Sequence, residues 1–229
     1  KEKDDFLFRT VHDLRSPSNT VRLILEKYAK SDFLKRYPEL KEDISIIQEL
    51  DARMLQLVND LLLVGKGEEA GTLVKKEKVD ISLIIQQVLN ECSAIAAVKN
   101  IKFRYDPPAD LPFVAADTGL VSEVVLNLVD NAIKYNKPGG DVIISHAVMN
   151  GFLETAIQDT GIGIAPENTD NLFKPYFRGE QSGKIRGTGL GLYIVKRLVE
   201  KMNGSVGISS LVGQGTKITF SLPMVTEKG

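Results

Sequence analysis

The sequence predicts a two-part chain in which an antiparallel helical hairpin is followed by a separate α+β domain. Three observations lead to this fold class. Two apolar stripes with heptad spacing occupy residues 1–66, a stretch rich in Gly, Lys and Glu covers 67–78, and residues 79–229 mix helix-like and strand-like patterns with glycine-rich segments. We therefore predict a helical domain over 1–66, a linker over 67–78 and a second domain over 79–229.

The helical part is predicted from two stripes whose members recur at alternating steps of four and three. The first stripe consists of Leu7, Val11, Leu14, Ser18, Val21, Leu25 and Tyr28, and the second of Leu40, Ile44, Ile47, Asp51, Met54, Val58 and Leu61. A break near 31–38 separates them, and Gly65 ends the second helix. One hairpin cannot cover both stripes, so we expect two chains to pair in a dimeric four-helix bundle.

The second domain is predicted from caps and turns. Asp80 can cap one helix, Asp117 or Thr118 can cap another, and Asn150-Gly151 is a strong hairpin signal. The predicted elements are a helix over about 81–98, a strand over 101–105, a helix from 118 to about 135, strands over 141–149 and 152–158, a helix over about 190–202, and a strand pair around 213–215. This sequence of elements indicates a domain of mixed α and β type.

Charge and cysteine content exclude several classes of function. Lysine plus arginine number 29 against 30 aspartate plus glutamate, so no excess of charge points to a nucleic-acid partner or an anionic membrane. The single Cys92 cannot form an internal disulfide, and one cysteine with two histidines is too few for an ordinary zinc site. No apolar run approaches the roughly 20 residues of a membrane span. We expect a reducing, cytoplasmic setting.

The charged start of the chain, residues 1–5, runs into the first helix without a turn signal. We interpret this helix as the continuation of one further upstream, so that the chain is a fragment of a longer protein.

His12 is a candidate nucleophile on the first helix. It follows Val11, which places it about 100° around the helix from the apolar stripe, where it faces water. Asp13 can orient the imidazole or take its proton, which leaves the other ring nitrogen free to attack a γ-phosphate. Pro17 removes a hydrogen bond to the Asp13 carbonyl and is expected to kink the helix. Taken alone, however, such a histidine is more often a surface residue without a role.

Three polar residues share one face of the helix predicted from 118 to 135. Asn127, Asn131 and Lys134 stand at positions i, i+4 and i+7. Two amide oxygens and an ammonium on one stripe suit a magnesium ion and its phosphates, because Mg²⁺ prefers hard oxygen ligands. A solvated helix face is the competing interpretation of the same pattern.

Two glycine-rich segments follow. In the first, Asp159 comes directly after a strand-like run, and the glycines at 161 and 163 let backbone approach a flat ligand closely. Such an aspartate could accept a hydrogen bond from an exocyclic amine, although a tight structural turn explains the glycines equally well. The second segment, 187–191, leads into an apolar helix whose N-terminus could meet phosphate oxygens.

Neither familiar phosphate-binding loop fits the second segment. The residues before it are polar rather than a buried strand, and Gly183-Lys184-Ile185 is not a Walker sequence. The stretch from Arg178 to Arg186 instead resembles a mobile lid, in which Lys184 and Arg186 are candidate phosphate contacts.

Taken together and in this order, the motifs resemble those of the sensor histidine kinase family over nearly the whole chain. Residues 12–17 resemble its H box, 127–135 its N box, 159–163 its first glycine box, 173–177 its F box and 187–191 its second glycine box. Five such segments in one order make the resemblance highly specific.

The resemblance implies a dimeric phosphotransfer hairpin joined to an ATP-binding α/β sandwich of the kind shared with gyrase and the heat-shock chaperone ATPases. On this analogy ATP and Mg²⁺ are the cofactors, and Asn131 and Asn127 are the metal ligands. The implied nucleotide contacts are Asn127, Asn131, Lys134, Tyr135, Asp159, Gly161, Gly163, Arg178, Lys184, Arg186, Gly187, Thr188, Gly189, Leu190, Gly191 and Thr216. Within this set, Asp159 reads the adenine amine and Thr216 lines the adenine pocket.

The activity that the resemblance implies is autophosphorylation on His12 and transfer of the phosphoryl group to an aspartate of a response regulator. Asp13 and Ser16 complete the implied catalytic set, with Ser16 where the family often has Thr or Asn for dephosphorylating the partner. ATPases of this fold carry a glutamate where Asn127 stands, and an amide cannot act as that base. A non-catalytic ATP-binding scaffold is the alternative. The upstream sensor, and any membrane anchor, would belong to the rest of the protein.

Overall fold

The computed structural model describes residues 20, 21, 23–25, 27, 28, 37, 40, 41, 43, 44, 46–48, 51, 54, 74–177 and 189–225. The chain divides into two compact units, residues 1–71 and 72–229. β1 begins at Glu77, which lies inside the range 67–78 predicted as a linker. The linker prediction is therefore too long by two residues at this end, and the other domain boundaries remain predictions.

In the first unit every described residue except Tyr37 is helical, and Tyr37 lies in the predicted break. The described stripe members therefore agree with the predicted helices. Leu25 and Asp51 are buried, whereas four other stripe members are between 39% and 44% exposed in the single chain: Val21, Tyr28, Ile47 and Met54. The dimeric bundle itself remains a prediction.

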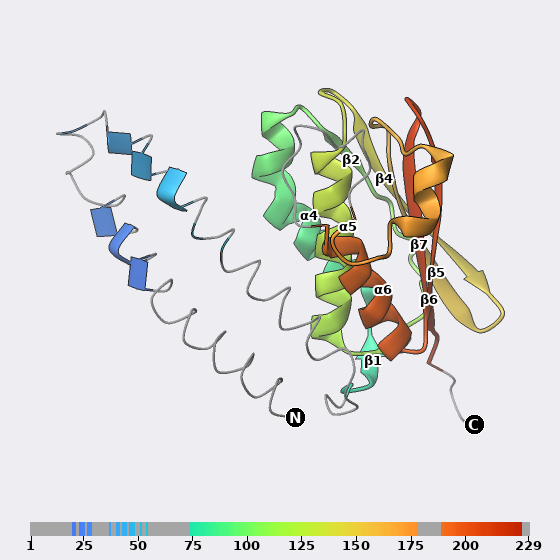
Figure 1. Cartoon of the computed structure of the whole chain (residues 1–229). Helices are drawn as coiled ribbons and strands as arrows, with labels where there is room; N and C mark the ends of the chain where they lie inside the picture. The colour runs from blue at the N-terminus through green and yellow to red at the C-terminus, as the bar shows by residue number, and fades with distance from the viewer. Residues whose placement is uncertain are drawn as a thin grey trace, which may run out of the picture. The chain divides into compact units, whose positions relative to one another are not determined.

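The second unit is built on a five-stranded mixed sheet (Figure 1). Its strands, in spatial order, are β2 (Lys102–Arg104), β4 (Asp141–Met149), β5 (Phe152–Asp159), β7 (Gly215–Pro223) and β6 (Ser205–Leu211). Only the β2 and β4 pair is parallel, and the other pairs are antiparallel. A separate two-stranded ribbon joins β1 (Glu77–Val79) to β3 (Val114–Ala116). β5 therefore lies in the middle of the sheet, with its C-terminal end at Asp159.

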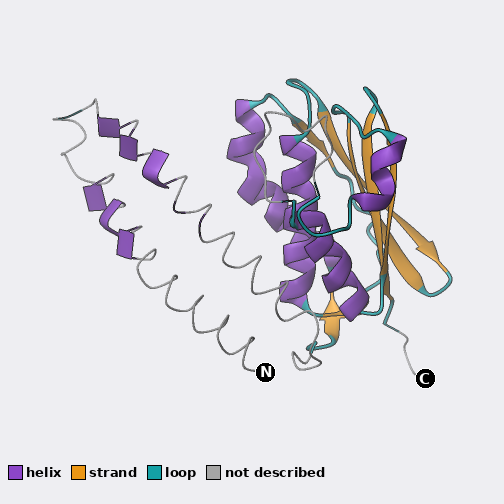
Figure 2. Ribbon diagram, viewed as in Figure 1, coloured by secondary structure: helices purple, strands orange, loops and turns teal. Residues whose placement is uncertain are grey.

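Three helices cover one face of this sheet (Figure 2): α4 (Ile81–Val98), α5 (Thr118–Lys134) and α6 (Gly191–Lys201). A short 3₁₀ helix, η1, spans Pro166–Asn171. The predicted caps are confirmed, since the Asp80 carboxylate accepts from Ser82 N–H and the Asp117 carboxylate accepts from Leu120 N–H. α5 contacts both α4 and α6, so it is the central helix of the layer.

The core lies between α5 and the sheet. Side chains that are almost fully buried come from both layers: Val121, Val124, Val125, Leu128 and Val129 on α5, and Val142, Leu153, Phe220 and Leu222 on the strands. On β4 the burial alternates from Val142 to Ser145, as expected for a strand with one face on the core. This packing holds the helix that carries Asn127 and Asn131 against the strand that ends at Asp159.

The hairpin between β4 and β5 forms where the sequence predicts it. Asn150 and Gly151 both have positive φ, 52° and 82°, as a two-residue turn of this kind requires. The helices predicted over 81–98, 118–135 and 190–202 are confirmed to within one residue at each end. The strand predicted over 101–105 is shorter, Lys102–Arg104, and β1, β3 and η1 have no counterpart in the sequence prediction.

α4 requires one correction to the sequence analysis. Among the described helices it alone has the length and composition of a membrane span, with a mean hydropathy of 1.5 over 18 residues. Its buried side chains, including Ile84, Ile85 and Val88, lie on the side that packs against α5. In this unit α4 packs against α5, while Leu83, Ile95 and Val98 on the same helix are exposed.

Candidate functional site

Asp159, the last residue of β5, is a buried carboxylate held by backbone. Its side chain is 6 % exposed, and Oδ1 accepts hydrogen bonds from Gly161 N–H at 2.8 Å and from Thr216 N–H at 3.2 Å. Burial raises the pKa of this carboxyl, while the backbone donors pull the pKa back down. Among the described contacts none engages Oδ2, which leaves that oxygen as the acceptor for a ligand.

Gly161 has no room for a side chain. A Cβ there would lie 2.2 Å from the Tyr135 carbonyl oxygen and 2.8 Å from Oδ1 of Asp159. The backbone of the first glycine segment is therefore pressed against the C-terminal end of α5, and Ile162 N–H donates to the same Tyr135 carbonyl at 3.1 Å. At this position the glycine is required by the close approach of other protein backbone, as the interpretation of a tight structural turn expects. The approach of a flat ligand remains a prediction.

The other side of this segment rests on the hairpin between β6 and β7. Gly163 has φ of +67°, and a Cβ would lie 2.0 Å from the Leu211 carbonyl oxygen. Gly213 N–H donates to the Ile162 carbonyl at 2.8 Å. Both glycines of the segment are therefore required by close packing, and the turn that they form serves to hold Asp159.

Ser210 is a site residue that the sequence analysis missed. Its Oγ accepts from Ile164 N–H at 2.8 Å, donates to the Gly215 carbonyl at 2.9 Å and lies 2.9 Å from Oγ1 of Thr216. Thr216 itself is 8 % exposed. Because Ser210 donates to Gly215, the Thr216 hydroxyl donates to Ser210 and keeps its lone pairs for other partners. Thr216 and Asp159 are neighbours through the hydrogen bond from Thr216 N–H to Oδ1 of Asp159, and their roles toward adenine remain predictions.

Asn127 and Asn131 lie on the side of α5 that meets the start of α6. The Asn127 Nδ2 group donates to the Glu123 carbonyl at 2.9 Å, and within the described part of the chain its Oδ1 accepts no hydrogen bond. A Cβ on Gly191 would lie 3.1 Å from that Oδ1 and 3.6 Å from Nδ2 of Asn131. The two amides therefore face the first residue of α6, where Leu190 supplies no side-chain cap.

This arrangement fits a magnesium ion with phosphates. Asn127 presents a neutral amide oxygen, a hard ligand of the kind that Mg²⁺ uses. No group of three or more His, Cys, Asp or Glu side chains occurs among the described residues, so any metal held by them would rely on amides and ligand phosphates. The N–H groups in the first turn of α6 have no intrahelical acceptors, and such groups favour anionic oxygens.

Lys134 and Tyr135 end α5. The Lys134 ammonium lies 5.6 Å from the centroid of the Tyr135 ring. The Lys99 ammonium donates to the Lys134 and Ile133 carbonyls at 2.8 Å and 3.1 Å, which compensates the negative end of the helix. Through its own carbonyl Tyr135 connects this helix end to Gly161, so it links the two halves of the site.

Several predicted residues lie outside the described ranges: His12, Asp13, Ser16, Arg178, Lys184, Arg186, Gly187 and Thr188. Their roles therefore remain predictions. Of the second glycine segment, Gly189, Leu190 and Gly191 are described. Gly189 has φ of +74°, and a Cβ there would lie 2.8 Å from the Phe177 carbonyl oxygen, so the chain before residue 178 meets the chain after residue 188.

Comparison with known proteins identifies the family of this fold. Residues 116–226 match the family described as histidine kinase-, DNA gyrase B-, and HSP90-like ATPase. The adaptive-response sensory kinase SasA of Crocosphaera subtropica is 30% identical over 230 residues, which cover 98% of this chain and 60% of the relative. The sensor protein kinase WalK of Staphylococcus saprophyticus is 31% identical over 97% of this chain and 37% of its own length. The chain thus spans 60% of the first relative's length and 37% of the second's.

Solved structures agree with the curated relatives. Full-length ShkA in complex with AMPPNP superposes with a TM-score of 0.78 at 29% identity, covering 98% of this chain and 47% of that one. The mycobacterial sensor histidine kinase MprB superposes with a TM-score of 0.58 at 30% identity, over 65% of this chain and 98% of its own. The fold, the paired amides of α5 and these relatives together show that the chain belongs to the sensor histidine kinases and contains the catalytic region of that family.

Proposed function

We propose that this chain binds ATP with Mg²⁺, transfers the γ-phosphoryl group to His12 and passes it to an aspartate of a response regulator. The observation that carries the proposal is the Asp159 carboxylate, whose Oδ1 is saturated by two backbone N–H groups while Oδ2 is left for a ligand. A buried acceptor of this kind selects a base with an exocyclic amine, as in adenine, over one with a carbonyl.

Base recognition would use Asp159 and Thr216 together. The carboxylate accepts from the 6-amino group, and the Thr216 hydroxyl, oriented by Ser210, offers lone pairs beside it. We expect Asp159→Asn to weaken ATP binding at least about tenfold, because an amide nitrogen facing the amine would leave two donors opposed. Isothermal titration with ATP tests this, and unchanged affinity would remove the assigned role of Asp159.

Phosphate binding would use the opposite end of the site. Asn127 and Asn131 would hold Mg²⁺, which supplies charge neutralisation on the phosphate oxygens. The N–H groups at the start of α6 would contact the same oxygens, with Lys134 as the nearby cation. Because Asn127 cannot take a proton from water, the site should retain ATP without rapid hydrolysis until an acceptor arrives.

The transfer to His12 is a substitution at phosphorus. The bond from a ring nitrogen to the γ-phosphorus forms as the bond to the bridging oxygen of ADP breaks, and Asp13 orients the imidazole or takes its proton. The domain would contribute positioning more than covalent chemistry. A further proposed activity is dephosphorylation of the response regulator, which Ser16 would assist.

The partners are proposed on the same basis. The exposed stripe members Val21, Tyr28, Ile47 and Met54 support a second copy of this chain as the partner of the helical hairpin. Sedimentation at micromolar concentration should show a dimer, and a monomer alone would contradict it. The remaining partners are a response regulator receiver domain and an upstream sensor region. The described catalytic unit is proposed to be cytoplasmic, with any membrane anchor in segments outside this chain.

The deciding experiment follows label from γ-labelled ATP with Mg²⁺. We expect acid-labile, alkali-stable label on the parent chain and none on His12→Ala. The chain contains only two histidines, so His146→Gln is the matched control and should keep its label. Label that survives in His12→Ala, or no label on a parent chain that binds ATP, would contradict the proposed transfer.

A further inference from the structure

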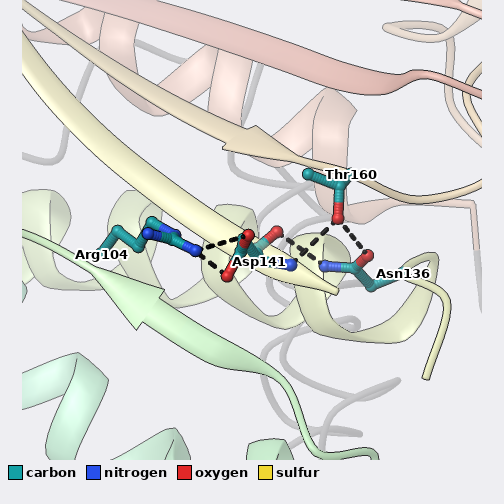
Figure 3. A network of polar contacts seen from close by, with 4 residues as sticks. All are labelled: Arg104, Asn136, Asp141 and Thr160. Atoms are coloured by element: carbon teal, nitrogen blue, oxygen red, sulfur yellow. Dashed lines mark hydrogen bonds and ion pairs between the residues drawn. The ribbon is translucent and has the colours of Figure 1, made fainter. Parts of the chain in front are cut away.

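A cluster of hydrogen bonds joins the end of α5 to the ends of β4 and β5 (Figure 3). We call Asn136, Asp141 and Thr160 the Asn136 cluster. The Asn136 Nδ2 group donates to the Asp141 carbonyl at 2.9 Å, and its Oδ1 accepts from Lys137 N–H at 3.0 Å and from the Thr160 hydroxyl at 3.3 Å. The same hydroxyl accepts from Asp141 N–H at 2.9 Å.

The cluster is closed and tightly packed. The Asp141 carbonyl accepts twice, from Asn136 and from Thr160 N–H at 3.2 Å. Asn136 is 6 % exposed. A Cβ on Gly140 would lie 2.3 Å from Oδ1 of Asn136 and 2.7 Å from Oγ1 of Thr160, so no side chain fits beside them. A buried network in which each group has its partners holds one geometry.

The residues of the Asn136 cluster are adjacent in the chain to residues of the candidate site. Asn136 directly follows Tyr135, at the end of the helix that carries Asn127 and Asn131, and Thr160 directly follows Asp159. The network therefore ties the residue after Tyr135, at the end of the helix that carries the two amides, to the residue after Asp159, at the end of β5. The contact of Gly161 with the Tyr135 carbonyl lies next to it.

We propose that Asn136 and Thr160 are positioning residues that hold the Asp159 carboxylate in place relative to the amides of α5, and that they thereby set the preference of the site for ATP over GTP. This inference rests on the proposed function, in which Asp159 reads the base. Neither side chain needs to touch the nucleotide, because a shift of the strand end relative to the helix would separate base recognition from phosphate recognition.

The ion pair beside the cluster is a separate feature. Arg104 contacts the Asp141 carboxylate at 3.0 Å, and Figure 3 shows it on the side away from Asn136. The two side chains are 62% and 24% exposed. Asp141 takes part in the cluster only through its backbone N–H and carbonyl, so the ion pair can be removed without changing any of those hydrogen bonds.

The test uses Thr160→Val, which keeps the shape of the side chain and removes its hydroxyl. Dissociation constants are measured for ATP, GTP and tripolyphosphate, each with Mg²⁺. We expect the ratio of ATP to GTP affinity to fall about tenfold, with GTP and tripolyphosphate bound nearly as in the parent. A general destabilisation of the protein would instead weaken the binding of all three ligands by the same factor, and that result would overturn the inference.

Two variants bracket the result. Thr160→Ser retains the hydroxyl and should restore the parent ratio, whereas Arg104→Gln should leave it unchanged. Asn136→Ala removes the other side of the cluster and should repeat the Thr160→Val result, so the inference can be tested even where the valine variant does not fold. If Thr160→Val and Asn136→Ala both kept the parent's ratio of ATP to GTP affinity, the inference would be overturned.

Failure of the proposed function gives a different pattern. A parent chain that binds ATP and GTP equally would contradict the role of Asp159, and with it the basis for this inference. A parent chain that prefers ATP, with variants that keep the same preference, would contradict only the positioning role.

Discussion

The two ends of the candidate site are held in place by different kinds of contact. The sheet end, comprising Asp159, Gly161 and Thr216, is held by backbone hydrogen bonds and by glycines with no space around them. The helix end, comprising Asn127, Asn131 and Gly191, consists of amide side chains on α5 that face the backbone at the start of α6. Backbone in a packed sheet cannot move without breaking several bonds, whereas an amide side chain can rotate. We therefore expect substitutions to damage the sheet end more severely.

The largest effect is expected from Gly161→Ala. The new Cβ would lie 2.2 Å from the Tyr135 carbonyl oxygen, so backbone must shift. We expect a loss of about 3 kcal/mol or more in the free energy of unfolding, together with loss of ATP binding. Gly207→Ala is the matched control, because nothing lies within 4 Å of its Cβ position, and it should be neutral or slightly stabilising. Equal melting temperatures for the two variants would contradict this account of the sheet end.

Gly191→Ala makes the same change at the helix end. Its Cβ would contact the Asn127 amide at 3.1 Å, a distance that a small rotation of the amide can relieve. We expect unchanged or slightly increased stability, because alanine is the better helix residue by up to about 1 kcal/mol. ATP affinity should fall by roughly three- to tenfold through crowding of the amide oxygen. A drop in melting temperature like that of Gly161→Ala would erase the distinction between the two ends.

Ser210→Ala tests the sheet end with a gentler change. The variant loses an acceptor for Ile164 N–H and the partner of the Thr216 hydroxyl. We expect destabilisation of about 1 kcal/mol and a modest loss of ATP affinity. Ser209→Ala, an exposed neighbour on the same strand, should change neither quantity in urea unfolding and titration. If Ser209→Ala matched Ser210→Ala, the hydrogen bonds of Ser210 would not be the cause.

The smallest effect concerns pH, since the backbone donors of Asp159 oppose the effect of burial on its pKa. Its pKa is raised in the folded state, so folding favours the protonated carboxyl. The stability that protonation contributes is present below the unfolded pKa and is lost as pH rises through the folded pKa. Without nucleotide, Asp159→Asn should therefore match the parent in acid and become the more stable protein near neutral pH. The measurement is urea unfolding of both proteins from acid to neutral pH. A difference in unfolding free energy that did not change with pH would contradict the sign of this pKa shift.

Local patterns were enough to predict most of the second unit. Asp80 and Asp117 mark helix starts because their carboxylates satisfy free N–H groups, and Asn150-Gly151 marks a hairpin because both residues accept positive φ. The strands β1 and β3 escaped prediction because each has three residues, too few to show alternation, and because each gains its stability from a partner far along the chain.

The residues of the candidate site were likewise predicted only in part. Asp159, Asn127 and Asn131 were singled out from the residues and the family resemblance, and their roles remain predictions. Ser210, Asn136 and Thr160 were missed, since a serine on a strand and an asparagine after a helix carry no signal of their own. The close glycine pair at 139 and 140 was the one available hint, and it indicates only a turn.

By itself, the sequence determined which residues share a helix face, where helices begin and where backbone must pass without side chains. Those properties depend on neighbours within a few positions. Only the tertiary structure decided that Thr216 N–H reaches Asp159 across 57 positions, that Gly161 presses on Tyr135 and that Gly191 faces the amides of α5. Such contacts depend on strand order, register and helix packing, which arise when distant segments bury their apolar faces together.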